Sequence, residues 1–275
     1  MPTLKQGTSL ARVDRLGAYI DSFQLSGRQI LMVSPDGRDT HGGCAVLAPY
    51  ANRVRNAVYV WNDRPYILPR NDGMNSIHGL VKQEKWSYDS ETRQAPNITE
   101  LKYDLVSPCY PSRIVIKNKY EIETDFFDVT CNVTNVGESS CPLVIGFHPY
   151  FLFRNKWSLS HENDLYKLQY KDSYFPSGEM EKTDFNGAGD LQSSNFDNTF
   201  FGGGKVTLNA GDHSLEIERR NMEYLVIYNG KYSKNTSVAL EPMTGAPDAF
   251  NNRIGLVTLD AGKEFQCGFK VKLVT

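Results

Sequence analysis

The chain has 275 residues and a formal net charge of −2, and 40% of its residues are hydrophobic, 12% aromatic and 23% charged. This composition is typical of a globular protein and excludes a disordered chain, a collagen and a coiled coil. Because 30 Lys and Arg residues are balanced by 32 Asp and Glu residues and form no basic stripe, we expect no nucleic-acid partner.

The first third of the chain is predicted to form short strands joined by tight turns. Two pairs of apolar segments, residues 18–25 with 29–33 and residues 58–61 with 66–68, each flank a short break. The breaks contain serine, glycine, asparagine, aspartate or proline, which favour turn conformations. Each pair therefore predicts a β-hairpin.

Later segments show side-chain patterns that are typical of strands. Polar and apolar residues alternate over residues 127–134, 214–218 and 265–273, as expected for strands with one face in a core and one in water. Residues 143–151 form an apolar run that is interrupted by one histidine, which predicts a buried strand. Residues 186–204 hold five glycines and are predicted to form long loops at an end of the sheets.

Helical signals are scarce along the whole sequence. No window shows a sustained apolar stripe at helical spacing, so the crossover helices of a parallel sheet are missing. We therefore predict an all-β protein, a large antiparallel β-sandwich or barrel. Because the chain contains no linker, repeat or low-complexity segment, we expect one domain over residues 1–275.

Neither targeting signals nor disulfide patterns stand out. The chain shows no secretory signal and no run of about 20 apolar residues that could span a membrane, so we expect a cytoplasmic protein without a membrane partner. Its five cysteines are scattered and form no CxxC pair. This spacing favours buried, inert thiols over disulfides or a zinc site, and we expect no metal and no cofactor.

Three polar residues interrupt otherwise apolar segments and are the candidates for chemistry. They are His78, His148 and Glu241, and together they supply the parts of general acid–base catalysis. Each also has a structural interpretation: a hydrogen-bonded loop histidine, a satisfied core histidine, and a glutamate in a salt bridge to Arg53 or Arg253. A metal site built from two histidines and a carboxylate also stays open at this point.

Four segments that contain these residues resemble the aldose 1-epimerase (mutarotase) family. They are residues 48–54, 76–80, 146–151 and 240–251; they occur in the family's order, and the resemblance spans nearly the whole chain. The resemblance implies a large antiparallel β-sandwich with a sugar bound in an open cleft on one sheet. It also implies an isomerase that interconverts the α and β anomers of a free aldose.

The resemblance assigns catalytic roles to the three candidates. Glu241 matches the base that takes the proton of the C1 hydroxyl, and His148 matches the acid that protonates the ring oxygen. His78 matches the second histidine, which hydrogen-bonds near the ring oxygen. Opening and reclosing the ring needs only a base and an acid, so the resemblance implies no cofactor.

Four further residues are predicted to contact the sugar. Asn52 and Arg53 match a pair that holds sugar hydroxyls, and Asp197 matches an aspartate that accepts hydrogen bonds from them. Arg53 is suited to forked contacts with neighbouring oxygens. Tyr150 is expected either to form a platform for the sugar ring or to lie in the core as an ordinary aromatic residue.

The identity of the sugar stays open, with galactose and glucose as the leading candidates. Leu152 and Val226 stand where galactose mutarotases usually carry Asn and Gln. The related hexose-6-phosphate epimerases bind phosphate through additional basic residues, for which the chain offers four candidates: Arg55, Arg70, Lys82 and Lys85.

Two further classes of protein remain as alternatives. One is a non-catalytic carbohydrate-binding protein of the same fold, because a fold does not fix a function. The other is a glycoside hydrolase or lyase that uses Glu241 and Asp197 as its carboxylate pair. As partners we expect only a small-molecule sugar and, at most, a second copy of the chain, so that the protein is a monomer or a homodimer.

Overall fold

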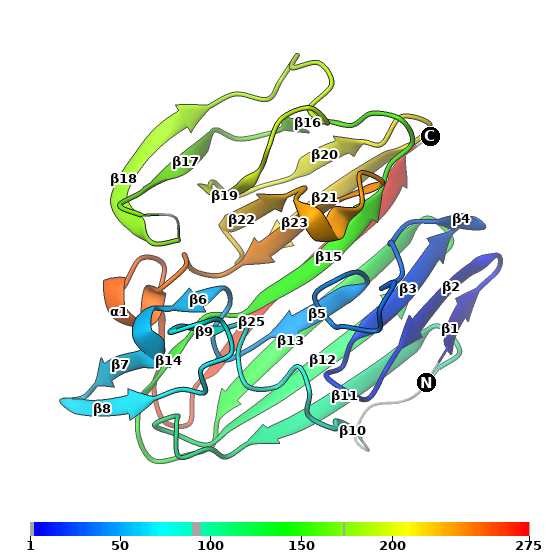
Figure 1. The fold of residues 1–275 in the computed structure, drawn as a ribbon. Helices are drawn as coiled ribbons and strands as arrows, with labels where there is room; N and C mark the ends of the chain where they lie inside the picture. Colours follow the sequence, from blue (N-terminus) through cyan, green and yellow to red (C-terminus); the bar gives the residue numbers. More distant parts are fainter. Residues whose placement is uncertain (1–2, 90–94, 173, 275) are drawn as a thin grey trace.

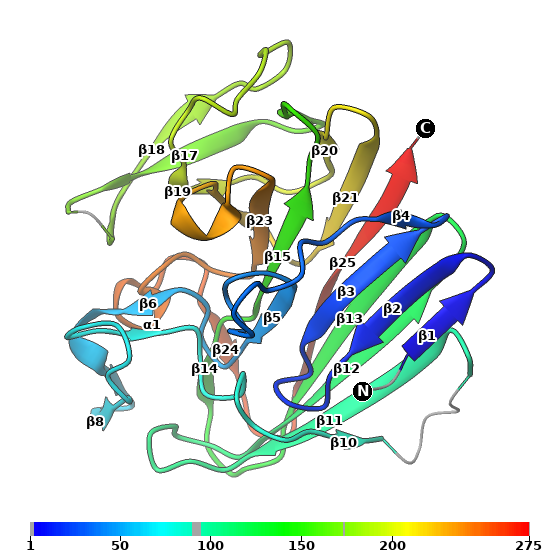
Figure 2. The same ribbon diagram turned by 45° about the vertical axis from the view of Figure 1, so that its right-hand side comes forward.

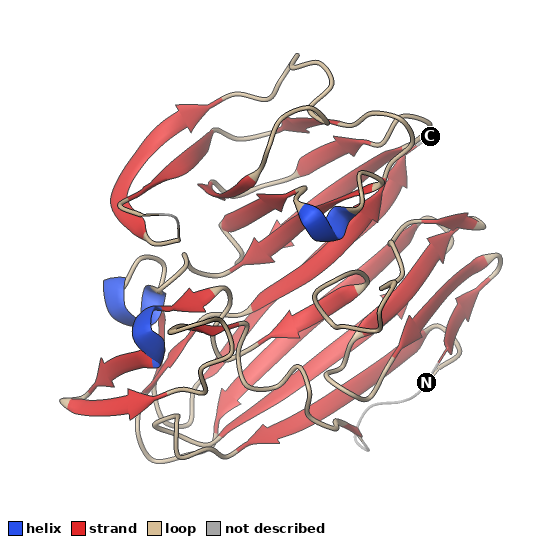
Figure 3. Ribbon diagram, viewed as in Figure 1, coloured by secondary structure: helices blue, strands red, loops and turns tan. Residues whose placement is uncertain are grey.

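The structure is a computed structural model that describes residues 3–89, 95–172 and 174–274. Most of the strand residues belong to two large antiparallel sheets, which lie one behind the other (Figures 1 and 3). The predicted all-β antiparallel sandwich is therefore confirmed. Within the described residues, no helix is long and apolar enough to cross a membrane.

The first sheet has eleven strands among the described residues, and it carries the site described below. In spatial order they are β1 (Thr3–Gln6), β2 (Ser9–Val13), β3 (Ile20–Leu25), β5 (Cys44–Leu47), β15 (Gly146–Leu152), β23 (Ser237–Met243), β22 (Tyr224–Tyr228), β19 (Asp197–Phe201), β17 (Leu165–Tyr170) and β18 (Pro176–Thr183), with β4 (Arg28–Gln29) paired to β3.

The second sheet has eight strands among the described residues and supports the first from behind. In spatial order they are β10 (Ser87–Tyr88), β11 (Ile98–Leu105), β12 (Ile114–Ile122), β13 (Phe126–Asn135), β25 (Glu264–Val274), β21 (Ser214–Arg220), β20 (Val206–Asn209) and β16 (Ser158–His161). Figure 2 shows β12, β13 and β25 running behind β2, β3 and β15.

Short pairs of strands and short helical turns complete the described part of the chain. The pairs are β6 (Arg53–Val54) with β9 (Ser76–Ile77), β7 (Val58–Trp61) with β8 (Arg64–Ile67), and β14 (Cys141–Leu143) with β24 (Val257–Leu259). The helical turns are α1 (Ala249–Asn252), η1 (Arg55–Ala57) and η2 (Lys231–Ser233).

Aromatic side chains join the two sheets in the core. The rings of Phe23 and Phe127 stack with their centroids 4.7 Å apart, and Phe147 contacts Phe269 at 5.1 Å. All four are buried. Along β12 and β13 buried and half-buried residues alternate without a break. The period of two seen in the sequence therefore marks which face of each strand enters the core.

The strand predictions are confirmed in position, with four corrections. In the first hairpin the second strand comprises only Arg28–Gln29, and in the second hairpin β8 begins at Arg64. The apolar run 143–151 is split: its first residue ends β14, residues 144–145 lie between the strands, and β15 begins at Gly146. Segment 186–204 is not loop throughout, because Asp197–Phe201 forms β19 against β22.

Candidate active site

Two adjacent strands near the middle of the first sheet bring an imidazole and a carboxylate together. The antiparallel register of β15 with β23 places His148 opposite Glu241, and β15 and β23 run side by side in Figure 1. His148 Nε2 lies 3.2 Å from Glu241 Oε1, and the two side chains are only 7% and 3% exposed. Two residues that are 93 positions apart in the sequence thus form a buried acid–base pair.

Burial moves the pKa values of the pair in opposite directions. It lowers the pKa of His148 to about 3 and raises the pKa of Glu241 well above its usual range, because a charged form loses its hydration in the protein interior. The negative charge of Asp197 raises the pKa of Glu241 further, and the positive charge of Arg53 opposes this. These shifts favour an uncharged imidazole beside a protonated carboxyl group.

The pair also presents polar atoms that no other described group satisfies. His148 Nδ1 and Glu241 Oε2 are buried and make no hydrogen bond within the described residues. Buried polar atoms without partners are costly and are uncommon outside functional sites. This cost is consistent with a site whose polar groups serve a purpose other than stability.

A strained turn brings His78 to the same place. The imidazole of His78 meets that of His148 edge to face, with 5.4 Å between the ring centroids. His78 has a positive φ of 64°, and its N–H donates to the carbonyl of Asn52 over 3.0 Å. Burial and the neighbouring His148 lower the pKa of His78 well below its usual range. The site therefore contains two buried imidazoles and one carboxyl group.

The two-stranded ribbon of β6 and β9 links Arg53 to this turn. Arg53 pairs in register with the residue that precedes His78. Its Nε donates to Asp72 over 2.6 Å, and its guanidinium lies 4.0 Å from the ring centroid of Tyr174. The structural alternative for Glu241, a salt bridge to Arg53 or Arg253, does not hold, since Glu241 pairs with His148 instead.

Three of the predicted sugar contacts line one hollow, and its residues on β22 and β19 lie on the side of β23 away from β15. They are Asn52, Arg53 and Asp197, and the same hollow is lined by Tyr170, Tyr174, Thr199 and Val226. The amide oxygen of Asn52 accepts a hydrogen bond from the Arg53 N–H over 2.8 Å, which holds the turn that carries both residues. The structure thus gathers hydroxyl-binding groups beside the acid–base pair.

Tyr150, the fourth predicted contact, lies in the interior. It is 1% exposed, and its ring stacks on that of His148 with centroids 4.9 Å apart. Its hydroxyl donates to the carbonyl of Thr40 over 2.9 Å. The position of Tyr150 thus favours a role in holding His148 over the expected contact with substrate.

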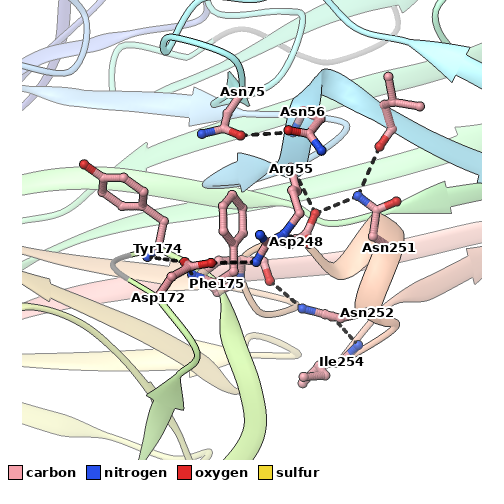
Figure 4. A network of polar contacts seen from close by, with 12 residues as sticks. Arg55, Asn56, Asn75, Asp172, Tyr174, Phe175, Asp248, Asn251, Asn252 and Ile254 are labelled. Atoms are coloured by element: carbon pink, nitrogen blue, oxygen red, sulfur yellow. Dashed lines mark hydrogen bonds and ion pairs between the residues drawn. The ribbon is translucent and has the colours of Figure 1, made fainter.

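A polar network fixes the loop that carries Arg53 (Figure 4). The N–H of Asp248 donates to the Arg53 carbonyl over 2.8 Å. The carboxylate of Asp248 accepts from the N–H of Arg55 over 2.9 Å. The guanidinium of Arg55 binds Asp172 over 2.9 Å, and Asn251 donates to Asp248. The conspicuous residues after Glu241 in the sequence therefore position Arg53.

One further histidine, His41, lies near the site; its sequence context indicates a loop residue that could also line a site. His41 is 8% exposed, its ring stacks on Tyr232 with centroids 3.6 Å apart, and its Nδ1 lies 2.8 Å from Asp36. His41 lines the same cavity as His78. The only signal in the sequence was the glycine pair that follows His41.

The chemistry that these side chains offer is proton transfer. Across residues 3–89, 95–172 and 174–274, no three His, Cys, Asp or Glu side chains gather in an arrangement that could hold a metal ion. An imidazole and a carboxyl group 3.2 Å apart can instead serve as an acid and a base on neighbouring atoms of one substrate.

Fold and site together define a β-sandwich protein with a buried acid–base pair at the centre of one sheet. The profile of the aldose 1-epimerase family matches residues 2–272. The chain therefore belongs to the aldose 1-epimerase family, a family of epimerases.

Individual relatives agree with this assignment at low sequence identity. The chain is 25% identical over 241 residues to YihR of Escherichia coli K12, an uncharacterized protein, covering 82% of this chain and 77% of YihR. It is 25% identical to an aldose 1-epimerase of Streptococcus thermophilus over an alignment of 285 positions, which covers 82% of this chain and 78% of that protein. A galactose mutarotase-like protein of Clostridium acetobutylicum has the same fold, with a TM-score of 0.87, 18% identity and coverage of 99% and 94%.

The turn at His78 depends on the glycine that follows it. Gly79 has a φ of 77°, and a Cβ there would overlap the backbone carbonyl of Ala48. We expect Gly79→Ala to lower the free energy of unfolding by about 2–4 kcal/mol, because it combines a strained φ with a steric overlap. Urea unfolding measures this change.

A matched control lies six residues earlier, in the segment between β8 and β9. Gly73 also has a positive φ of 63°, but no atom lies within 4 Å of a Cβ built there. Gly73→Ala carries only the cost of the left-handed conformation, about 1–2 kcal/mol. Equal losses in the two variants would show that the contact with Ala48 does not hold the turn.

Proposed function

We propose that this protein is an aldose 1-epimerase that interconverts the α and β anomers of a free aldohexose such as glucose or galactose. The observation that carries this proposal is the pair of His148 and Glu241, which are 3.2 Å apart, buried, and on adjacent strands. Membership of the family and an adjoining hollow lined by hydroxyl-binding groups support it.

Ring opening needs one proton removed from the C1 hydroxyl and one delivered to the ring oxygen. In the proposed step the proton of the pair passes from Glu241 to His148 over the 3.2 Å between them. The His148 imidazolium then gives it to the ring oxygen while the Glu241 carboxylate takes the proton of the C1 hydroxyl. The C1–O bond of the ring breaks, and the pair is left as a neutral imidazole and a protonated carboxyl group. After rotation about C1–C2 the reverse transfers close the ring on the other face.

The pair therefore holds one proton and no net charge before and after the step. This balance suits a buried site, because a net charge there would be costly. In the same proposal His78 hydrogen-bonds near the ring oxygen, while Asn52, Arg53 and Asp197 hold the other hydroxyls. Because these residues are spread over almost 200 positions of the sequence, we also propose that residues 1–275 act as one domain.

The charges around the site favour a free sugar over a sugar phosphate. Two of the basic residues considered for phosphate binding are already paired with carboxylates. Arg55 binds Asp172 over 2.9 Å, and Lys82 binds Asp39 over 3.3 Å. A phosphate would have to displace these partners and approach their negative charges.

Polarimetry of freshly dissolved α-D-glucose and α-D-galactose tests the proposal. We expect the wild-type protein to accelerate mutarotation of at least one of these sugars, and Glu241→Gln to lower kcat by about 10²–10⁴-fold, because an amide cannot accept the C1 proton. Glu218→Gln, the same substitution at an exposed position of β21, serves as the control and should keep the wild-type rate. EDTA should leave the rate unchanged.

Three results would contradict the proposal. Acceleration of glucose 6-phosphate but not of the free sugars would favour the phosphate epimerases. Binding of a sugar without acceleration would favour a non-catalytic carbohydrate-binding protein. Wild-type activity in Glu241→Gln would remove the proposed base.

The same substitution should not destabilise the fold. The amide introduced by Glu241→Gln can keep a hydrogen bond to His148, and the substitution removes a carboxyl group whose ionised form is costly to bury. We expect Glu241→Gln to raise the melting temperature by roughly 2–4 °C, which corresponds to about 1 kcal/mol. Calorimetry on both proteins checks this, and a fall of several degrees would show that the carboxylate stabilises the fold.

The pH dependence of kcat/KM should report the shared proton. As the pH rises the pair loses this proton, so kcat/KM should fall on the alkaline side. Asp197 raises the pKa of Glu241, and Asp197→Asn should therefore move the alkaline midpoint to lower pH. Arg53 lowers that pKa, and Arg53→Gln should move the midpoint to higher pH.

Rates between about pH 5 and 10 locate these midpoints. Both substitutions also weaken sugar binding in this proposal, so the position of the midpoint is the readout and not the height of the profile. Shifts of the same sign in the two variants would contradict the proposed electrostatic coupling to Glu241.

A further inference from the structure

His78 lines a large cavity that lies toward β3 and β5 in the first sheet, whereas the hollow that contains Asp197 lies toward β22 and β19. It is formed mainly by segments 34–41 and 77–84, and its volume is about 1040 Å³. In Figure 1 the segment that precedes β5 arches in front of that strand. Pockets that hold drug-sized ligands measure about 300–1,000 Å³, so this cavity has room for more than one hexose ring.

The proposed chemistry fixes which part of the sugar faces this cavity. C1 must lie at Glu241 and the ring oxygen at His148 and His78. C2 is bonded to C1 and extends toward Asp197 and Arg53 on the far side of Glu241. C5 is bonded to the ring oxygen, so C5 and its substituent C6 lie on the side of His78, where the cavity opens.

His41 offers a prepared hydrogen-bonding group to a ligand in this cavity. Its side chain is 10% exposed, it is fixed by stacking on Tyr232, and its Nδ1 is bound to Asp36 over 2.8 Å. Its Nε2 makes no hydrogen bond within the described residues and is not among their buried polar atoms. Because the carboxylate of Asp36 accepts a hydrogen bond, Nδ1 of His41 carries the hydrogen and donates it. Nε2 of the neutral ring is then free to accept a hydrogen bond from a hydroxyl.

The charges that line the cavity favour a neutral ligand. Its basic residues are Arg38 and Lys82, and Lys82 is already paired with Asp39 over 3.3 Å. Besides Asp39 the lining contains three more acidic residues: Asp14, Asp21 and Glu84. An anionic substituent would meet more negative than positive charge, whereas hydroxyl groups can use both kinds of side chain.

We propose that this cavity is a subsite for a second, uncharged sugar ring attached to C6 of the aldose, so that the protein accepts the reducing end of a 1→6-linked disaccharide. This inference rests on the proposed function and adds the substrate class. The aldose ring occupies the acid–base site, and the second ring lies between segments 34–41 and 77–84, where His41 Nε2 accepts one of its hydroxyls.

The test compares kcat/KM for the mutarotation of isomaltose, maltose and glucose. Isomaltose carries its second ring on C6 and maltose carries it on C4. We expect kcat/KM of the wild-type protein to be at least tenfold higher for isomaltose than for glucose, because only isomaltose uses the second subsite. Maltose should not share this advantage.

Two variants link the preference to the cavity. Leu80 is half-buried and lines the cavity, so Leu80→Trp should fill part of it and reduce the isomaltose-to-glucose ratio of kcat/KM at least tenfold. His41→Leu removes the proposed acceptor and should also reduce this ratio. It serves as the test in case Leu80→Trp does not fold. Val106→Trp, at a 73% exposed position outside the cavity lining, is the matched control and should keep the wild-type ratio.

The possible failures of the two proposals are distinguishable. Mutarotation of glucose without a preference for isomaltose, a preference for maltose, or an isomaltose preference that neither cavity variant reduces would overturn the subsite and leave the proposed function intact. Absence of acceleration with every sugar would overturn the proposed function itself.

Discussion

The arrangement of the site depends on one imidazole and one carboxyl group that are buried side by side in the middle of a sheet. A lone charge at that depth would cost several kcal/mol, so His148 and Glu241 must share their proton. The sharing requires that β15 and β23 keep one register, because a slip by one residue would turn either side chain to the other face. Aromatic contacts behind the sheet, such as Phe147 with Phe269, oppose such a slip.

The strands of the first sheet and the segments that connect them contribute different groups to the site. The strands hold the acid–base pair, and they are held in turn by ladders on both sides. The loops supply the groups that surround it: the β6–β9 ribbon carries Arg53 and leads into His78, and Asp248 fastens that ribbon from the opposite end of the chain. The pair of His148 and Glu241 thus lies on rigid strands, whereas Arg53 and His78 lie on connecting segments of the kind that tolerates change.

Sequence patterns located strands best where one face of the strand is exposed to solvent. Alternation marked β13, β21 and β25, but β15 and β23 are buried on both faces and show no alternation, so their pairing was not predictable. β19 was hidden among glycines and asparagines. For the site, polar residues within apolar runs and the family resemblance identified the histidines and Glu241. The sequence left an arginine open as the partner of Glu241. Its pairing with His148 depends on the order and register of strands, which a single sequence does not carry.

The bond between Arg55 and Asp248 spans 193 positions of the chain. A ribosome adding about 5–20 residues per second makes the second partner roughly 10–40 s after the first. β15 likewise precedes its neighbour β23 by more than 80 residues. The nascent protein thus carries its histidines early but has no complete acid–base pair until the last fifth of the chain is made. A chain that is cut short before β23 therefore lacks Glu241 and cannot form the pair with His148.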